Sequence, residues 1–236
     1  MAFEETLIAS LDALHVPHTP EQINLMRAHY DLLVRENAQY NLTAIKEEDD
    51  AAVKHYADSC AALAAIPIPA HAALIDVGAG AGFPGIPLKI MRGDIRLTLM
   101  DSTRKKADFG GMCIEALGFK DARSIHMRAE DLGQSPSHRG KYDTATARAV
   151  APIRVLAEYM LPLLKPNGLM LCWKGPSASE ELAEAGNALK VLGGKPEGLH
   201  SVELEGYAHN IVVIRKTGPT PAKYPRKSGL PAKTPL

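Results

Sequence analysis

The stretch IDVGAGAGFPGIPLKI, residues 75–90, passes from a strand pattern through a glycine-rich turn into a helix pattern. Its four glycines and two prolines place the most flexible and the most rigid residue types side by side. Glycine permits a positive φ and leaves no Cβ between the backbone and a ligand. Proline fits the first turn of a helix, where its missing N–H would have had no partner. We therefore predict a rigid turn after a strand, shaped for a ligand that comes close to the backbone.

Short strand patterns, separated by stretches of helical length, run through the centre of the chain. They span residues 73–77, 95–101, 122–127, 142–147 and 169–173. Strands that alternate with helices predict a parallel sheet with helices on both faces. Two more β-rich runs, 198–206 and 209–216, are so close in sequence that we expect them to pair antiparallel at the far edge. The predicted fold is α/β and Rossmann-like, with a mostly parallel seven-stranded sheet.

The first 66 residues carry helical patterns instead. Thr19 can cap a helix and Pro20 fits its first turn, and a third helix is expected over about 48–64. Apolar residues recur at steps of three and four in the first two helices, at Phe3, Leu7, Ile8, Leu11, Leu14, Ile23, Met26, Tyr30, Leu33 and Val34. The chain therefore divides into an N-terminal helical segment (1–66), a Rossmann-like domain (67–216) and a Pro-rich C-terminal arm (217–236). We expect the arm to be extended rather than part of the core.

Length and composition limit the class of protein. The 236 residues suffice for one sizeable core, and 46% hydrophobic with 23% charged residues is ordinary for a soluble globular protein. No apolar run approaches the roughly 18 residues of a membrane span, and the N-terminus is too acidic for a signal peptide. We expect a cytoplasmic protein without membrane contact. A monomer is expected because no coiled-coil pattern or large apolar stripe is present.

The cysteines argue against two kinds of site. Cys60, Cys113 and Cys172 are far apart and odd in number. This spacing predicts neither a disulfide framework nor a metal cluster. We expect buried thiols and no bound metal.

Charge is unevenly distributed although the net charge is zero. Residues 206–236 contain six basic and no acidic side chains, and the remaining 205 residues hold 21 basic against 27 acidic ones. A basic tail on an acidic body indicates a polyanionic partner, although many such tails are merely solvated.

The glycine spacing bears on which ligand the turn holds. The loop reads G-x-G-x-G from Gly78, with Asp76 two residues before it, whereas dinucleotide sites usually read G-x-G-x-x-G. An acid beside the loop would repel a pyrophosphate and suits the ammonium and sulfonium of S-adenosylmethionine. Asp101 ends the next strand, where a carboxylate can accept both ribose hydroxyls. S-adenosylmethionine is favoured, while NAD and a purely structural role in helix–strand packing stay open.

Several sequence runs together resemble the RsmG (GidB) family of bacterial 16S rRNA methyltransferases. The resemblance extends in order from about Tyr40 to the C-terminus. The runs that carry it are YNLTAI (40–45), KHYADS (54–59), DVGAGAGFPGIPLKI (76–90), RAEDL (128–132), TARAVAP (146–152), WKG (173–175) and KYPRKSGLPAKTPL (223–236). The combination of this glycine loop with this tail is highly specific.

The resemblance implies a class I methyltransferase fold and methylation, dependent on S-adenosylmethionine, of N7 of one guanine in 16S rRNA. That guanine lies in the conserved 530 loop and is guanine 527 in the family's rRNA numbering. The implied partner is 16S rRNA, as the small ribosomal subunit or its assembly intermediate. The implied cofactor-binding positions are Asp76, Gly78, Gly80, Gly82, Phe83, Asp101, Ala129, Glu130 and Arg148.

The chemistry of N7 is consistent with the residues after the fourth strand. Amine methylation generally uses an Asp/Asn-Pro-Pro-aromatic motif there, and carbon-5 methylation needs a cysteine nucleophile. TARAVAP (146–152) provides neither. Guanine N7 already exposes a lone pair, so direct in-line transfer needs alignment but no general base.

Arg148 is the catalytic candidate, as the residue that orients the cofactor and the base edge. Its always-charged guanidinium can clamp a carboxylate, an RNA phosphate or guanine O6. The alternative is a surface arginine paired with Glu130 or Asp143. His55 and Asp58 lie three apart on the third helix and can face the same cleft, although a structural role is equally open.

The tail is the candidate RNA-binding segment. Its members are Lys223, Tyr224, Arg226, Lys227 and Lys233. The cations would follow the RNA backbone while Tyr224 stacks on a base. The rival explanation is that the tail packs back on the domain. Lys89, Lys105 and Lys106 flank the predicted cleft and either meet phosphate or are solvated.

Three departures from the family pattern stand out, one of them a pair of glycines, and two other functions stay open. Gly110 and Gly111 lie mid-helix, Ala147 stands where serine is common, and His209 stands near a frequent arginine. These departures bear on stability or RNA affinity. The other functions are an enzyme acting on a small molecule and a non-catalytic ribosome-assembly factor.

Overall fold

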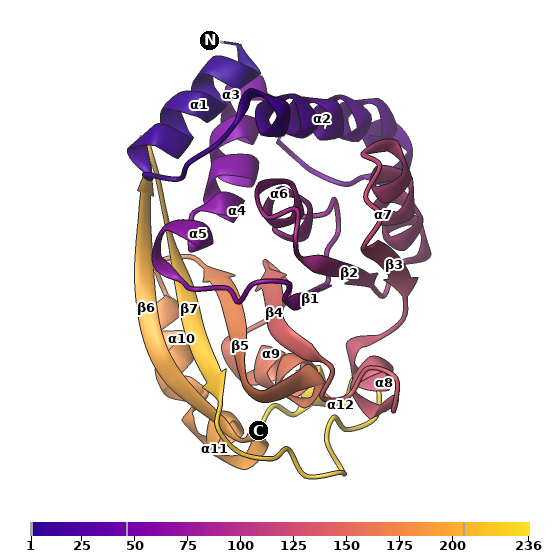
Figure 1. The fold of residues 1–236 in the computed structure, drawn as a ribbon. Helices are drawn as coiled ribbons and strands as arrows, with labels where there is room; N and C mark the ends of the chain where they lie inside the picture. The colour runs from indigo at the N-terminus through magenta and orange to yellow at the C-terminus, as the bar shows by residue number, and fades with distance from the viewer. Residues whose placement is uncertain (1, 46, 205) are drawn as a thin grey trace.

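Seven strands form a single sheet in the order β3-β2-β1-β4-β5-β7-β6 in the computed structural model, which describes residues 2–45, 47–204 and 206–236 (Figure 1). Neighbouring pairs among β1 to β5 are parallel, and β7 runs antiparallel between β5 and β6. The strands are β1 Ala73–Val77, β2 Arg96–Asp101, β3 Ala122–His126, β4 Tyr142–Arg148, β5 Leu164–Lys174, β6 Gly194–Leu204 and β7 Tyr207–Lys216. The predicted sheet, including its antiparallel far edge, is confirmed.

The strand order places a switch point between β1 and β4. The chain leaves β1 toward β2 and β3 on one side, and continues from β4 toward β5 on the other. Ligands of open α/β sheets bind outside the carboxyl ends of the strands at such a point. The turn after Val77 and the loop after Arg148 both lie there.

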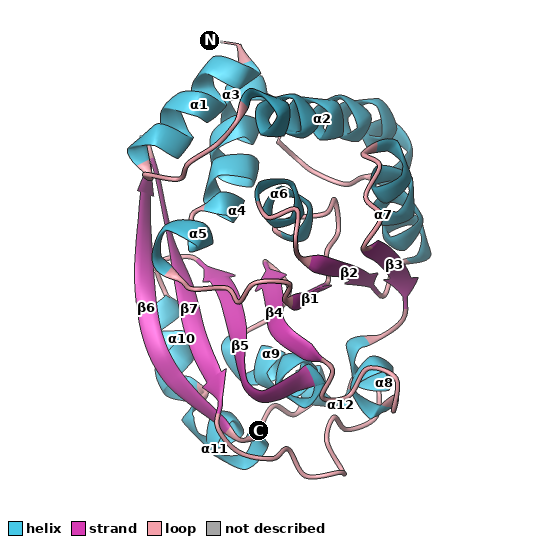
Figure 2. Cartoon of the chain, viewed as in Figure 1, coloured by secondary structure: helices cyan, strands magenta, loops and turns pink. Residues whose placement is uncertain are grey.

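Helices cover both faces of the sheet (Figure 2). Those before β4 are α1 Phe3–Ala13, α2 Pro20–Tyr40, α3 Glu48–Ala51, the π-helical η1 Ala52–Ala57, α4 Asp58–Cys60, α5 Ala62–Ala65, α6 Gly85–Met91, α7 Arg104–Ala116 and α8 Ala129–Gln134. After β4 come α9 Ile153–Met160, the 3₁₀ turn η2 Leu161–Leu163, α10 Ala178–Glu184, α11 Gly186–Leu192 and α12 Leu230–Lys233. The predicted third helix is present as an almost continuous helical run with a π turn inside it.

Two apolar clusters fill the space between sheet and helices. One joins α1, α2 and the helical run 48–65 to α6, α7 and one sheet face. The other joins α8, α9 and α11 to the opposite face. The N-terminal helices therefore share a core with the sheet.

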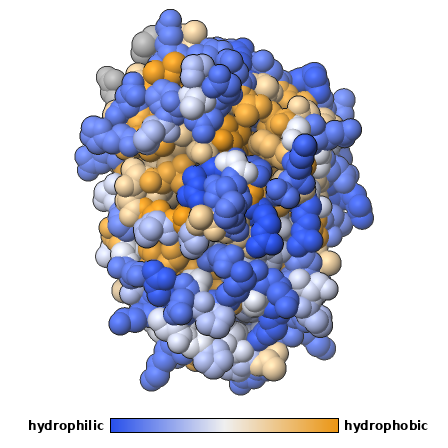
Figure 3. All heavy atoms as spheres, in the orientation of Figure 1, coloured by the Kyte–Doolittle hydropathy of each residue, from blue (hydrophilic) through white to orange (hydrophobic). Residues whose placement is uncertain are grey.

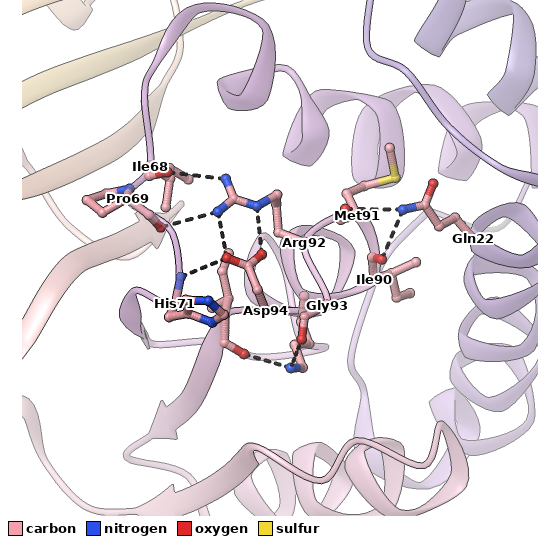
Figure 4. A network of polar contacts seen from close by, with 11 residues as sticks. Gln22, Ile68, Pro69, His71, Ile90, Met91, Arg92, Gly93 and Asp94 are labelled. Atoms are coloured by element: carbon pink, nitrogen blue, oxygen red, sulfur yellow. Dashed lines mark hydrogen bonds and ion pairs between the residues drawn. The ribbon is translucent and has the colours of Figure 1, made fainter.

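The end of α6 is fastened to two earlier segments (Figure 4). Thr19 and Gln22 form the predicted cap of α2, and the Gln22 amide also donates to the carbonyl oxygens of Ile90 and Met91. Arg92 binds Asp94 with two N–H groups and donates to the carbonyls of residues 68 and 69. This network fixes α6 against the segment that leads into β1.

Lys89 does not face a phosphate. Its side chain is buried, and its ammonium donates to the carbonyl oxygens of Gly93 and Ile95 at 2.7 and 2.6 Å. Desolvation lowers the pKa of this ammonium. The interpretation of Lys89 as a phosphate ligand is therefore wrong.

The packing of α7 explains why residue 110 is a glycine, but it does not explain the glycine at 111. A Cβ on Gly110 would lie 2.9 Å from Ser124 Oγ and 3.2 Å from Leu99 Cδ1, so glycine lets α7 approach β2 and β3 closely. A Cβ on Gly111 would meet no atom within 4 Å. Only Gly111 carries the full helix cost, about 1 kcal/mol relative to alanine.

The C-terminal segment 217–236, called the strap from here on, lies against the domain (Figure 1). Tyr224 is buried in the core beside α8 and α9, and α12 contacts α9. The expectation of an extended arm outside the core is wrong. Prolines remove regular structure from this segment, but its carbonyl groups are bound by side chains of the domain.

The hydropathy of the molecular surface differs between the lower and the upper part of one face. On the face seen in Figure 3, hydrophilic residues predominate below, and hydrophobic residues show between the helices above. Within the described part of the chain, no helix is long and apolar enough to cross a membrane.

His29 joins three elements in the first cluster. Its Nε2 lies 3.1 Å from the Ala81 carbonyl oxygen, to which it donates, and Nδ1 accepts from the Tyr56 hydroxyl at 2.8 Å. The ring is fully buried, and desolvation lowers its pKa from 6.5 to about 4. Helix α2 thereby holds both the glycine turn and the π turn while its imidazole stays neutral.

Replacing His29 with glutamine is expected to flatten the acid dependence of stability. The unfolded chain takes up a proton below pH 6.5 and the folded chain only near pH 4, so stability is complete above 6.5 and is lost as pH falls. Glutamine keeps one donor and one acceptor without titrating. Between pH 7.5 and 5 the free energy of unfolding should fall by about 2 kcal/mol less than in wild type. Urea unfolding measures this, and the exposed His126→Gln is the control, which should follow the wild-type profile. Equal slopes in His29→Gln and wild type would contradict the assignment.

Candidate active site

The turn after β1 combines three left-handed glycines with a close backbone approach. Gly78, Gly80 and Gly82 have φ values of 73°, 57° and 93°. A Cβ on Gly78 would lie 2.6 Å from Val150 Cγ2, and one on Gly82 would lie 2.3 Å from Ile86 Cδ1. At Gly80 the nearest atom to such a Cβ would be the Gly78 carbonyl oxygen at 3.9 Å. Packing and a positive φ therefore require glycine at 78 and 82, whereas at 80 a side chain would meet no close contact and glycine is favoured by φ alone.

Asp76 holds the far end of this turn. Its Oδ2 accepts from the Gly85 N–H at 2.9 Å and its Oδ1 accepts from the Thr146 hydroxyl at 2.9 Å. The side chain is fully buried, and desolvation raises its pKa to about 6 against these hydrogen bonds. Both oxygens accept hydrogen bonds from the protein, so Asp76 fixes the conformation of the turn from its buried side.

Asp101 holds the near side of the turn. Its Oδ2 accepts from the Gly80 N–H at 3.0 Å and its Oδ1 accepts from the Thr103 N–H at 2.7 Å. The turn is also tied to β2 because the N–H groups of residues 78 and 79 donate to the Met100 carbonyl. A carboxylate has about four acceptor sites, so Asp101 keeps capacity for ligand hydroxyls beside Gly80.

Arg148, at the end of β4, is fixed by the helical run 48–65. Nη1 donates to the Lys54 carbonyl at 2.9 Å and to Asp58 Oδ2 at 3.3 Å. Nη2 donates to His55 Nδ1 at 3.0 Å, and the guanidinium carbon lies 5.0 Å from the centre of the Phe83 ring. Its partner is thus neither Glu130 nor Asp143. These bonds use three of five N–H donors, so the cation is oriented and retains donors.

His55 links Arg148 to the glycine turn. Its ring stacks on Phe83 with centroids 4.6 Å apart, and its Nε2 lies 2.8 Å from Thr43 Oγ1. Because arginine only donates, Nδ1 is the acceptor and Nε2 carries the proton. Desolvation, followed by the charge of Arg148, lowers the pKa of His55 to about 3. The imidazole is neutral and too weakly basic to remove a proton near pH 7.

Asp58 is the buried counter-ion of this group. Its Oδ1 lies 3.2 Å from His209 Nδ1, and its backbone carbonyl accepts from the Trp173 indole N–H at 2.9 Å. The side chain of Asp58 is fully buried, whereas that of Arg148 is 11% exposed. His209, noted only as a departure from an arginine, therefore supplies an N–H donor to Asp58. The H-x-x-D run at 55–58 is the sequence feature that pointed to Asp58. The strand residues that Asp58 contacts could not be identified from the sequence.

The π turn makes these contacts compatible. Inserting a π turn before Asp58 changes which side chains face the sheet, and π bulges occur frequently at functional sites. Here Lys54, His55 and Asp58 all reach Arg148. The predicted helix over 48–64 therefore differs from the observed one by the π turn over Ala52–Ala57.

Ala129 and Glu130 begin α8 at the carboxyl end of β3. Their N–H groups lie in the first helical turn, where no intrahelical acceptor exists. The buried Glu130 side chain accepts the Gly229 N–H at 2.7 Å. The structure joins Asp76, the glycines, Phe83, Asp101 and Arg148 into one group, and it joins Glu130 to the strap.

The predicted RNA-binding residues fall into two sets. Lys223, Lys227 and Lys233 are exposed. Tyr224 is buried, and Arg226 is bound to Glu158 through its backbone N–H, Nε and Nη2. Stacking of Tyr224 on a base would require it to leave the core, so the structure contradicts that role.

No thiolate or metal chemistry is supplied by the described residues. Cys60, Cys113 and Cys172 are buried, and desolvation raises the pKa of each thiol, to about 12 in the last two. Among residues 2–45, 47–204 and 206–236, no group of three or more His, Cys, Asp or Glu side chains is placed to hold a metal ion.

These features fit S-adenosylmethionine. Asp101 has acceptor capacity for ribose hydroxyls, Gly80 leaves space in front of the turn, and Arg148 offers a cation for a carboxylate. The unpaired N–H groups that begin α8 suit the acceptor nitrogens of adenine. The donor set thus matches the polar groups of this cofactor.

Replacing Asp58 with asparagine is expected to lower the free energy of unfolding by about 3 kcal/mol, because it leaves Arg148 without its buried counter-ion. Asp31→Asn is the matched control, since Asp31 also pairs with an arginine but is 57% exposed. That change should cost less than about 0.5 kcal/mol. Urea unfolding at pH 7.5 compares the two, and equal small losses would show that the Asp58 pair does not constrain the fold.

Known proteins agree with this geometry. Residues 22–212 match the family described as GidB, rRNA small subunit methyltransferase G. A protein of Pelotomaculum thermopropionicum named ribosomal RNA small subunit methyltransferase G is 45% identical over 234 residues, covering 98% of both chains.

Solved structures agree in fold only. A SAM-dependent methyltransferase from Aquifex aeolicus is 18% identical with a TM-score of 0.52, over 70% of this chain and 93% of that one. The [4+2]-cyclase SpnF is 15% identical with a TM-score of 0.56, over 87% and 98%. Because a cyclase shares the fold, the fold alone does not establish the reaction. The family match and the near-full-length relative do establish kinship: the chain belongs to the rRNA small subunit methyltransferase G (GidB) family.

Proposed function

We propose that this protein transfers the methyl group of S-adenosylmethionine to N7 of one guanine in the conserved 530 loop of 16S rRNA. The observation that carries the proposal is the placement of Arg148. Its oriented guanidinium stands at the switch point beside the glycine turn, with Phe83 against one face. Family membership supplies the substrate class.

The surroundings of Arg148 support transfer to an atom that needs no deprotonation. Asp58 and Asp76 are fully buried and engaged by donors, and the pKa of His55 is held at about 3. The oxygens of both carboxylates are already engaged by donors of the protein, the His55 imidazole is too weakly basic to act near neutral pH, and the three thiols are protonated. An acceptor such as N7, with its own lone pair, requires only alignment.

The chain's own residues then divide the work. When bound, S-adenosylmethionine supplies an electrophilic methyl group on a sulfonium. Asp101 and Gly80 fix the ligand beside the turn, and Arg148 directs its remaining N–H donors toward a carboxylate, a phosphate or guanine O6. Donation to O6 would orient the base while leaving N7 unhindered.

The three exposed strap lysines are proposed RNA contacts. Lys223, Lys227 and Lys233 lie on the segment whose remaining polar groups bind the domain. Their positions are therefore fixed by the fold, and they present cations to a polyanion at little ordering cost.

The deciding assay uses purified protein, methyl-labelled S-adenosylmethionine and small subunits that lack the modification, with naked 16S rRNA in parallel. We expect borohydride–aniline cleavage to reveal 7-methylguanine at one site in the 530 loop. Label at another position, or at none, would overturn the proposal. The better of the two substrates identifies the assembly stage at which the protein acts.

Arg148→Lys serves as the site control in the same assay. Lysine keeps the charge but not the fork that binds Lys54, Asp58 and His55 together. We expect kcat/KM to fall at least tenfold while circular dichroism stays unchanged. Arg215→Lys, at a half-exposed pair with Glu197, should retain wild-type rates.

Neutralising the strap lysines is expected to weaken RNA binding and its salt dependence. The triple change of Lys223, Lys227 and Lys233 to glutamine should reduce the slope of log K against log salt by about 2 to 3, because each neutralised phosphate adds about 0.7–0.9 to that slope. The control changes three exposed lysines elsewhere: Lys141, Lys190 and Lys195. If both triple variants behave alike, the strap has no special role in binding RNA.

A further inference from the structure

We infer that the strap positions the cofactor-binding turn of α8, so that an intact C-terminus sets the affinity for S-adenosylmethionine. This inference rests on the proposed function in one respect, namely that the first turn of α8 contacts the cofactor. It concerns binding of the cofactor and is independent of which RNA is methylated.

The strap is attached to α8 at both ends of the helix. Gly229 N–H donates to Glu130 at the start of the helix, and the Gln134 amide at its end donates to the carbonyls of Pro225 and Ala222 at 2.7 and 3.2 Å. Between them, a Cβ on Gly133 would lie 2.5 Å from Pro225 Cγ. Both ends of α8 therefore touch the strap.

Arg139 reinforces the same attachment from the loop after α8. Nη1 donates to the carbonyls of Gly133 and Tyr224 at 2.9 and 2.6 Å, and Nη2 donates to the Thr220 carbonyl at 2.9 Å. One guanidinium thus binds the helix and the strap together. The cation stabilises backbone carbonyls that would otherwise lack partners in a segment without regular structure.

A second fork ties the strap to α9. Arg226 Nε and Nη2 donate to the two oxygens of Glu158 at 2.9 and 2.6 Å, and the Arg226 N–H donates to the same carboxylate at 2.7 Å. Glu158 is 1% exposed. Because α9 follows the loop after Arg148, the strap bridges the two helices that flank the site.

The Glu130 contact gives the strap a direct route to the cofactor. Ala129 and Glu130 begin a helix of six residues, too short to hold its own conformation without support. The buried carboxylate of Glu130 accepts the Gly229 N–H at 2.7 Å. Gly229 has a φ of 82°, a left-handed conformation that favours glycine. Gly229 and Arg226 are positioning residues in this scheme.

Ending the chain after Ser228 removes the contact with Glu130. The shortened protein keeps Arg226, Tyr224 and the carbonyls bound by Gln134 and Arg139, so most of the strap stays attached. It loses Gly229, α12 and one lysine. The matched control is full-length Lys233→Gln, which removes the same charge and leaves the Glu130 contact intact.

Calorimetry without RNA measures the effect on the cofactor. We expect the shortened protein to bind S-adenosylmethionine about tenfold more weakly, equal to about 1.4 kcal/mol, and the control to match wild type. Hydrogen exchange should be faster at the amides of 129–134.

A second pair of variants covers the case in which the shortened chain does not fold. Arg226→Lys retains the charge beside Glu158 but loses the fork, and should raise the cofactor dissociation constant about threefold. Arg215→Lys is the same change at the half-exposed fork with Glu197 and should leave the dissociation constant unchanged.

Unchanged cofactor affinity in the folded strap variants would overturn the inference, and weaker RNA binding alone would mark the strap as an RNA contact only. The proposed function and the role of the strap can be contradicted independently of each other. Wild-type protein that binds the cofactor but does not methylate 16S rRNA contradicts the proposed function, while the comparison of cofactor affinities still decides the role of the strap. If wild type binds no cofactor, both fail.

Discussion

The buried carboxylate of Asp58 constrains the whole site, because a charge removed from water must be met by donors. Its donors come from β4 and β7, as Arg148 and His209, and its own backbone carbonyl accepts from Trp173 on β5. One residue of an N-terminal helix thereby links three strands of the sheet. The N-terminal helices are for this reason part of the site, since they hold Arg148 in the orientation that it shows beside the glycine turn.

Around that pair, three carboxylates near the carboxyl ends of the strands each accept a hydrogen bond from the backbone N–H of a glycine. Asp76 accepts the N–H of Gly85, Asp101 that of Gly80, and Glu130 that of Gly229. Bonds from backbone N–H groups to carboxylates are stronger than neutral ones, and glycine lets the carboxylate come close. At Gly85 a Cβ would lie 2.9 Å from Asp76 Oδ2. The acids that look available for catalysis in the sequence are thus largely occupied in holding backbone, which agrees with a reaction that needs no base.

The features that were predicted correctly from the sequence are those determined by residues close together in the chain. The strands, the cap at Thr19, the glycine turn and the place of Asp101 follow from periodicity, capping and φ preference within a few residues. Contacts over long separations were not predictable in this way. Asp58 meets Arg148 and His209 across 90 and 151 residues, and Glu130 meets Gly229 across 99. The π turn, the burial of Lys89 and the docking of the strap depend on such packing, and a Pro-rich basic tail looks the same in sequence whether it is solvated or bound.

The strap shows why its Pro-rich, basic composition did not predict that it packs against the domain. Prolines exclude regular structure, but they also lower the entropy lost when a segment becomes ordered, so a few strong attachments suffice to hold it. Arg139 and Arg226 supply these attachments by binding carbonyl groups and a buried carboxylate. Lys223, Lys227 and Lys233 on the same segment remain exposed. The same segment therefore presents cations outward and buries Tyr224 inward, and an RNA drawn to its outer side would press on the helix that carries Ala129 and Glu130. Cofactor and RNA would then be coupled through α8 as well as through Arg148.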